Sequence, residues 1–189
     1  MAVRRALSIV LRTYKTGEAD KVVVFFTREY GKIRGIARAA RKTRSRFGGR
    51  LELGTELDLT FFEKASSELV SVDRCDIVHS RFTELGYPIL ASTLGYVTDL
   101  VDNFVLEREP NQHVYRLLRA TVDAIPDTES PEAQARYFEA WLLRLVGFYP
   151  RHKTCPVCSR KLATEVARYL VSEHRIECSR CLKTGVSLS

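Results

Sequence analysis

The chain has 189 residues, of which 45% are hydrophobic, 28% charged and 10% aromatic, a mixture typical of a folded globular protein. Its longest stretch without a charged residue, residues 85–98, is interrupted by a proline and is shorter than the roughly 18 to 20 apolar residues of a membrane span. The first residues contain too short an apolar run for a secretory signal, so we expect a cytoplasmic protein that spans no membrane.

The net charge of +7 is divided unevenly along the chain. Residues 1–50 carry a net charge of +11, residues 51–150 carry −9, and residues 151–189 carry +5. Two basic terminal segments on either side of an acidic central segment indicate separate modules. The basic segments are suited to bind a polyanion. Nucleic acid is therefore the first candidate partner.

The first eighty residues are predicted to form strands. Short segments rich in β-branched and aromatic residues occur at 6–12, 22–27, 32–38, 55–63 and 69–78. Gly35, inside the third of these segments, is where a small barrel would bend sharply. We expect a five-stranded, mostly antiparallel barrel of the OB type, because closure of the sheet removes its exposed edges.

Residues 31–50 hold eight basic side chains and no acidic one. By strand parity the first three share one face of the third predicted strand, while residues 41–46 are expected to form a mobile loop. The predicted DNA-binding residues are Lys32, Arg34, Arg38, Arg41, Lys42, Arg44, Arg46 and Arg50. Neutralisation of several phosphates would give strong, salt-sensitive binding. A solvated basic loop with no ligand is the alternative interpretation.

Three aromatic residues, Tyr14, Tyr30 and Phe47, lie among these charges. Each would either stack on an unpaired base, as is common in OB barrels, or turn into the core. The sequence leaves both alternatives open for each of the three.

After residue 80 the hydrophobic period becomes that of helices. Apolar residues recur at steps of three and four from Leu90 to Phe104, and again over residues 114–125. A third helix is predicted to begin at the Ser130 cap and to end at Gly147. Its apolar stripe, which includes the only tryptophan, Trp141, is interpreted as bundle core. Two acids of the first helix, Asp99 and Asp102, are interpreted as a solvated face.

Four of the five cysteines form two pairs, Cys155-Pro-Val-Cys158 and Cys178-Ser-Arg-Cys181. This spacing is typical of a structural zinc site, since each pair can direct two thiolates at one tetrahedral ion. Four cysteines leave no coordination position for an activated water, so we expect one structural Zn²⁺.

For the other potentially reactive residues, the sequence favours neither a ligand role nor a catalytic one. His152 and His174 are near the cysteine pairs in sequence but are not needed as ligands, and Cys75 is interpreted as a small buried hydrophobic residue. The chain has no phosphate loop, nucleophile elbow or zinc-protease motif, and the deaminase pattern is incomplete. We therefore expect no catalytic residue, no enzymatic activity and no small-molecule substrate.

Several segments resemble, in order and spacing, those of one known family. Residues 17–21 and 26–33 are similar to its first hairpin, residues 42–48 to its basic loop, and residues 137–150 to its last bundle helix before a zinc module. The family is the bacterial recombination mediator RecO, and the resemblance covers nearly the whole chain.

The resemblance implies an α+β protein with an OB domain at residues 1–80, a helical domain at 81–150 and a zinc-binding module at 151–189. It also implies binding to single- and double-stranded DNA and annealing of single strands without ATP. RecA would be loaded onto strands coated by single-stranded DNA-binding protein, in company with RecR and RecF. Family members usually continue into further helix after the second cysteine pair, whereas this chain ends at Ser189.

Two other classes of protein remain open. The first is a non-catalytic RNA-binding protein, because OB barrels and zinc ribbons also serve RNA-binding factors. The second is a nuclease or another nucleic-acid enzyme whose site is not recognisable from sequence.

Overall fold

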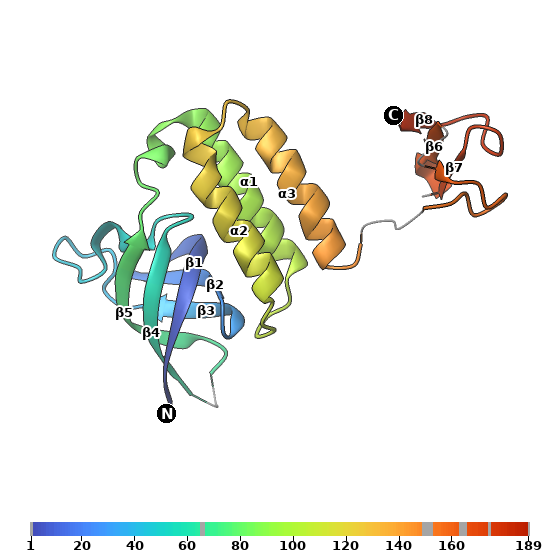
Figure 1. Cartoon of the computed structure of the whole chain (residues 1–189). Coiled ribbons are helices and arrows are strands. Elements are labelled where there is room, and N and C mark those ends of the chain that lie inside the picture. The colour runs from blue at the N-terminus through green and yellow to red at the C-terminus, as the bar shows by residue number, and fades with distance from the viewer. Residues whose placement is uncertain (1, 65–66, 149–152, 163–165, 174, 189) are drawn as a thin grey trace. The chain divides into compact units, whose positions relative to one another are not determined.

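The computed structural model describes residues 2–64, 67–148, 153–162, 166–173 and 175–188. The chain divides into two compact units, residues 1–148 and residues 149–189 (Figure 1). The first unit contains both the barrel and the helices, and the finer division at residue 80 stays a prediction. Within the described ranges, no helix is both long and apolar enough to cross a membrane.

Five strands form a closed barrel in the order β1-β2-β3-β5-β4. They are β1 (Ala2–Thr16), β2 (Asp20–Thr27), β3 (Gly31–Ala37), β4 (Glu56–Glu63) and β5 (Val70–His79). Only the β3–β5 pair is parallel. The α+β class, the five strands and the mostly antiparallel OB-type barrel are confirmed. β1 is longer than predicted because its first half pairs with β4 and its second half with β2.

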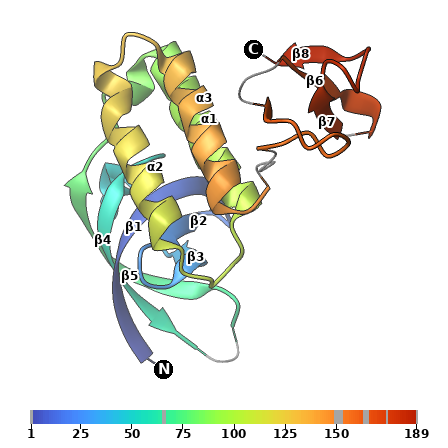
Figure 2. The ribbon, with the colours of Figure 1, turned by 45° about the vertical axis from the view of Figure 1, so that its right-hand side comes forward.

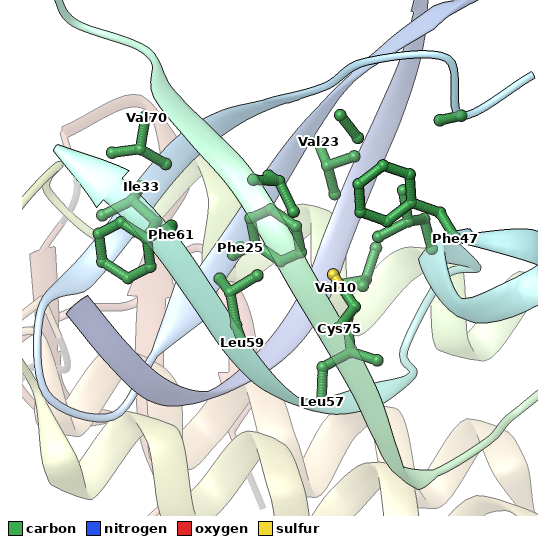
Figure 3. Packing of buried hydrophobic residues seen from close by; sticks show 14 of the residues in the cluster. Val10, Val23, Phe25, Ile33, Phe47, Leu57, Leu59, Phe61, Val70 and Cys75 are labelled. Atoms are coloured by element: carbon green, nitrogen blue, oxygen red, sulfur yellow. The ribbon is translucent and has the colours of Figure 1, made fainter. Parts of the chain in front are cut away.

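The barrel interior is filled by alternate residues of all five strands (Figure 3). Phe25, Leu59 and Phe61 point into it, and each is at most 1% exposed. Cys75 is 4% exposed, as predicted, and burial raises the pKa of its thiol to about 12. At Gly35, where β3 meets β5, an added Cβ would lie 2.7 Å from a methyl group of Val72. Glycine is therefore required there for close approach of the two strands.

Three helices cover one outer side of the barrel: α1 (Pro88–Phe104), α2 (Gln112–Ala124) and α3 (Pro131–Leu145). Outward-facing residues of β1 and β2, such as Ile9, Val24 and Phe26, are buried in one cluster with the helix residues Leu94 and Val101. Both faces of β2 are therefore buried, which explains its continuous apolar run. Figure 2 shows α1 and α3 packed side by side.

The third helix begins as predicted, because the Ser130 hydroxyl accepts a hydrogen bond from the backbone N–H of Ala133. The interpretation of Trp141 as bundle core is wrong. Its side chain is 39% exposed, and the Arg144 guanidinium lies 5.1 Å from the ring centroid. Phe138 and Leu142 define the buried side of α3, and Trp141 lies at the edge of that stripe.

Helix α2 is tied to the barrel by a buried carboxylate. Glu56, at the start of β4, is 3% exposed and accepts a hydrogen bond of 3.1 Å from the Tyr115 hydroxyl. Its oxygens also lie 3.2 Å from Nε of Arg119 and 3.0 Å from Nδ1 of His79. Burial raises the pKa of Tyr115, so its hydroxyl keeps the proton that it donates.

The second unit contains a three-stranded antiparallel sheet in the order β7-β6-β8. Its strands are β6 (Ala167–Leu170), β7 (Arg175–Cys178) and β8 (Val186–Leu188). Cys178 is the last residue of β7, and Cys181 lies in the turn that follows it.

Candidate nucleic-acid interface and metal centre

The eight predicted DNA-binding residues lie in three places on the barrel. Lys32 and Arg34 are on β3. Arg46 precedes a 3-10 helix, η1 (Gly48–Leu51), and Arg50 lies within it, both next to β5. The other four lie on the loop that follows β3: Arg38, Arg41, Lys42 and Arg44.

The two cations of β3 are bound by acids of the helical region. Lys32 is 7% exposed, and its Nζ lies 3.3 Å from a carboxylate oxygen of Asp102 on α1. Arg34 forms an ion pair with Glu107 in the α1–α2 connection. The ammonium group of Lys32 is therefore not accessible to a phosphate, and Lys32 is not part of the proposed interface.

The interpretation as a solvated face is wrong for Asp102, whose side chain is 17% exposed, whereas Asp99 is half-exposed. Arg12 of β1 forms ion pairs with both carboxylates, and Lys32 binds the second. These acids hold the end of α1 against the barrel. Helical spacing shows that two acids share a face, but it does not show which element that face meets.

The network makes a testable prediction about Lys32. Replacement by alanine leaves the half-buried Asp102 carboxylate with Arg12 alone, so we expect a loss of about 1 to 3 kcal/mol in the free energy of unfolding. The affinity for DNA should change less than twofold. Urea unfolding and fluorescence anisotropy measure the two quantities. A larger loss of affinity would show instead that Lys32 contacts DNA.

The loop after β3 is anchored at its start to the β1–β2 turn. The backbone N–H of Arg41 donates to the carbonyl of Ala19 at 2.8 Å, and its guanidinium donates to the carbonyl of Glu18 at 3.1 Å. The backbone N–H of Ala39 donates to a carboxylate oxygen of Asp20 at 2.7 Å. The predicted loop is present, and these contacts order its first residues.

At its other end the loop is anchored by apolar residues. Phe47 and Leu51 are each 1% exposed and belong to the barrel core (Figure 3). The Arg46 guanidinium lies 4.9 Å from the Phe47 ring centroid and 3.8 Å from a carboxylate oxygen of Asp73. Between the two anchors Lys42 and Arg44 are exposed, as is Arg38, and no ion pair joins these three to another described residue.

The three candidate stacking residues have different environments. Phe47 is buried, and Tyr30 packs on the barrel core with its ring edge-on to Phe61. Tyr14 is 47% exposed on β1. Of the three, Tyr14 alone presents a large part of its ring to solvent.

The four paired cysteines meet at one point in the second unit. Their Sγ atoms all lie within 4.8 Å of one another, and those of Cys158 and Cys178 are 3.5 Å apart. A zinc ion with Zn–S bonds of about 2.3 Å places its four sulfurs about 3.8 Å apart, so the donor set fits one tetrahedral ion. The two nearby histidines that were not expected to be ligands, His152 and His174, lie outside the described residues.

Backbone N–H groups around the sulfurs favour thiolates. Hydrogen bonds, first from the N–H of Cys178, lower the pKa of the Cys155 thiol to about 6. The N–H of Cys181 is the main group that lowers the pKa of Cys178. The lowered pKa values of Cys155 and Cys178 favour the thiolate, which is the form that binds a metal.

The fold and the two sites define a class of protein: an OB-type barrel with an exposed basic loop, joined to helices and to a cluster of four cysteines that could hold a metal ion. Residues 1–81 match the family model described as "Recombination protein O N terminal", and residues 89–186 match "Recombination protein O C terminal". The chain belongs to the RecO family.

Relatives from several bacteria carry the name "DNA repair protein RecO". The chain is 40% identical over 164 residues to the protein of Koribacter versatilis. The aligned region covers 85% of this chain and 65% of that protein. It is 31% identical over 186 residues to the protein of Syntrophus aciditrophicus, which covers 97% of this chain and 71% of the relative. The chain thus spans about two thirds of the length of these two relatives.

Proposed function

We propose that this protein binds DNA during recombinational repair and anneals complementary single strands without ATP. The observation that carries the proposal is the exposed, anchored basic loop at one end of an OB-type barrel. The family and the names of its relatives support the repair role. The proposed interface comprises Arg34, Arg38, Arg41, Lys42, Arg44, Arg46 and Arg50.

Charge neutralisation is the proposed mechanism of annealing. Two DNA strands repel each other, and a loop that binds their phosphates removes part of this repulsion while it releases counterions. The step needs no nucleotide hydrolysis and no catalytic side chain. It agrees with the lack of a recognisable catalytic motif in the sequence.

The four cysteines are proposed to hold one Zn²⁺ that stabilises the second unit. Cys155, Cys158, Cys178 and Cys181 would fill its coordination shell, so the ion would supply structure and not a reactive water.

The proposed partners follow from family membership. We propose that the protein acts on DNA in the bacterial cytoplasm with RecR and RecF. There it would help to load RecA onto strands coated by single-stranded DNA-binding protein. An RNA-binding role for the same barrel and metal module is the second candidate.

An annealing assay tests this function. Two complementary oligonucleotides, one carrying a fluorophore and the other a quencher, should pair faster with the protein than without it, in the absence of ATP. The acceleration should persist when both strands are coated with single-stranded DNA-binding protein. Preferential binding to structured RNA in competition would favour the RNA-binding alternative, and strand cleavage with added magnesium would reveal a nuclease.

A further inference from the structure

A row of three side chains crosses the outer face of β1, β2 and β3. Tyr14 pairs with Val22, and Val22 pairs with Ile36. Directly paired residues on neighbouring strands point to the same side of a sheet. Their neighbours Val23 and Ala37 are buried in the barrel core, so the row faces outward. Sequence reasoning missed the row because it depends on strand register.

The helical region covers the neighbouring row of the same face but leaves the Tyr14 row exposed. In the next row on the same face, Arg12 pairs with Val24 and Val24 with Arg34. Val24 is 2% exposed in the cluster with the helices, and both arginines are bound by helical-region acids. Tyr14 is 47% exposed, whereas Val22 and Ile36 are half-buried. The outer face of the barrel therefore becomes accessible at the Tyr14 row.

The basic loop begins on the other side of the row. Arg38 is two residues beyond Ile36, and the Arg41 guanidinium is held by the carbonyls of Gly17 and Glu18 in the β1–β2 turn. The row thus lies between the Arg12–Arg34 row and the cations of the loop. An accessible row that ends in one aromatic ring and has cations on both sides is suited to a single strand, in which a base can stack while the phosphates are neutralised.

A groove of about 380 Å³ lies beside Tyr14. Val22 and Val24 supply apolar surface, and Lys15, Arg34 and Asp102 supply polar groups. The Arg12 guanidinium donates to the Tyr14 hydroxyl at 3.3 Å and lies 6.0 Å from the ring centroid, which holds the ring in place. The groove therefore offers a positioned aromatic face with both apolar and charged walls.

We propose that Tyr14 is a base-stacking residue that gives the interface a preference for single-stranded over duplex DNA. An unpaired base would stack on the Tyr14 ring, with its flanking phosphates near Arg34 and the start of the basic loop. The faces of duplex bases are covered by their neighbours, so a duplex gains only the ionic contacts. This inference rests on the proposed function and adds selectivity to the same surface.

Substitution of Tyr14 separates stacking from charge. Tyr14→Ala should weaken binding of a single-stranded oligonucleotide about 5- to 100-fold in fluorescence anisotropy. Binding of a duplex of equal length and the salt dependence of both should stay unchanged. Tyr14→Phe should keep the single-strand affinity, because the aromatic face remains. Tyr137→Ala, which removes a tyrosine 55% exposed on α3, serves as the matched control and should bind like the parent protein.

A fluorescent probe tests stacking directly. Tyr14→Trp in a Trp141→Phe background places the only indole in the groove, and its emission should be quenched by single-stranded DNA and little by duplex. Equal losses for single strands and duplex in Tyr14→Ala, or no loss and no quenching, would overturn the inference while the proposed function stands. A parent protein that binds no DNA would overturn both.

Discussion

Charge reversal of the exposed part of the basic loop should abolish annealing. In a variant with Arg38, Lys42 and Arg44 replaced by glutamate, we expect the affinity for single-stranded DNA to fall by orders of magnitude. The dependence of log affinity on log salt should weaken by about two units, since each lost phosphate contact contributes about 0.7. Fluorescence anisotropy at several salt concentrations measures both quantities.

The reason for a large loss without unfolding lies in the exposure of these three side chains. None of them forms an ion pair with another described residue, so each substitution should change the free energy of unfolding by no more than about 0.5 kcal/mol. Arg41 and Arg46 are kept in this variant because their guanidinium groups donate to backbone carbonyls that help to hold the loop.

A second triple variant controls for net charge. Arg28, Lys64 and Arg116 are also exposed, on the β2–β3 turn, after β4 and on α2. Their replacement by glutamate changes the net charge of the protein by the same amount, but the basic loop is left intact. We expect a small loss of affinity and normal annealing. If both triple variants behave alike, or if the loop variant anneals with an unchanged salt slope, the loop is not the binding surface. The basic residues of the second unit would then be the next to test.

Loss of the metal should unfold the second unit and leave the barrel intact. Cys155→Ser or Cys178→Ser should abolish stoichiometric zinc in elemental analysis, because each removes one of four ligands that meet within 4.8 Å. Zinc binding supplies several kcal/mol to the folding of such small modules. We therefore expect rapid proteolysis of the region after residue 148, with DNA binding by the first unit largely retained.

Two further measurements make this prediction specific to the metal site. Cys75→Ala, in the barrel core, should keep one zinc per chain while it lowers the stability of the first unit. Zinc affinity should fall as the pH decreases, because protons compete for the four sulfurs. Backbone N–H groups lower the pKa of Cys155, to about 6, and that of Cys178, so both thiols lose their protons more readily than an ordinary cysteine. A serine variant that retains both the ion and the protease resistance would refute the structural role.

Local pattern in the sequence was sufficient to predict the strands of the barrel, the three helices and the candidate metal ligands, but not the strands β6 to β8 of the second unit. Strand alternation and helical period depend on residues a few positions apart, and the five strands and three helices follow from them. The two cysteine pairs predict metal binding by themselves, because each short turn brings its two sulfurs together. Gly35 was expected to mark a sharp bend, and the close approach of β5 that requires glycine there became evident only in the structure.

Only the tertiary structure decided which side chains face solvent at the candidate interface. Lys32 and Arg34 share a strand face and a charge, yet α1 covers the first with Asp102 and leaves the second half exposed beside Glu107. Tyr14 and Phe47 are both aromatic residues near basic ones. Phe47 is buried in the barrel core, whereas Tyr14 lies on a part of the outer face that the helices leave exposed. These outcomes depend on strand register and on the packing of α1 against β1–β3, contacts between residues up to about ninety positions apart in the chain. No local pattern shows whether these side chains are buried or exposed, because their burial depends on the residues distant in sequence that pack against them.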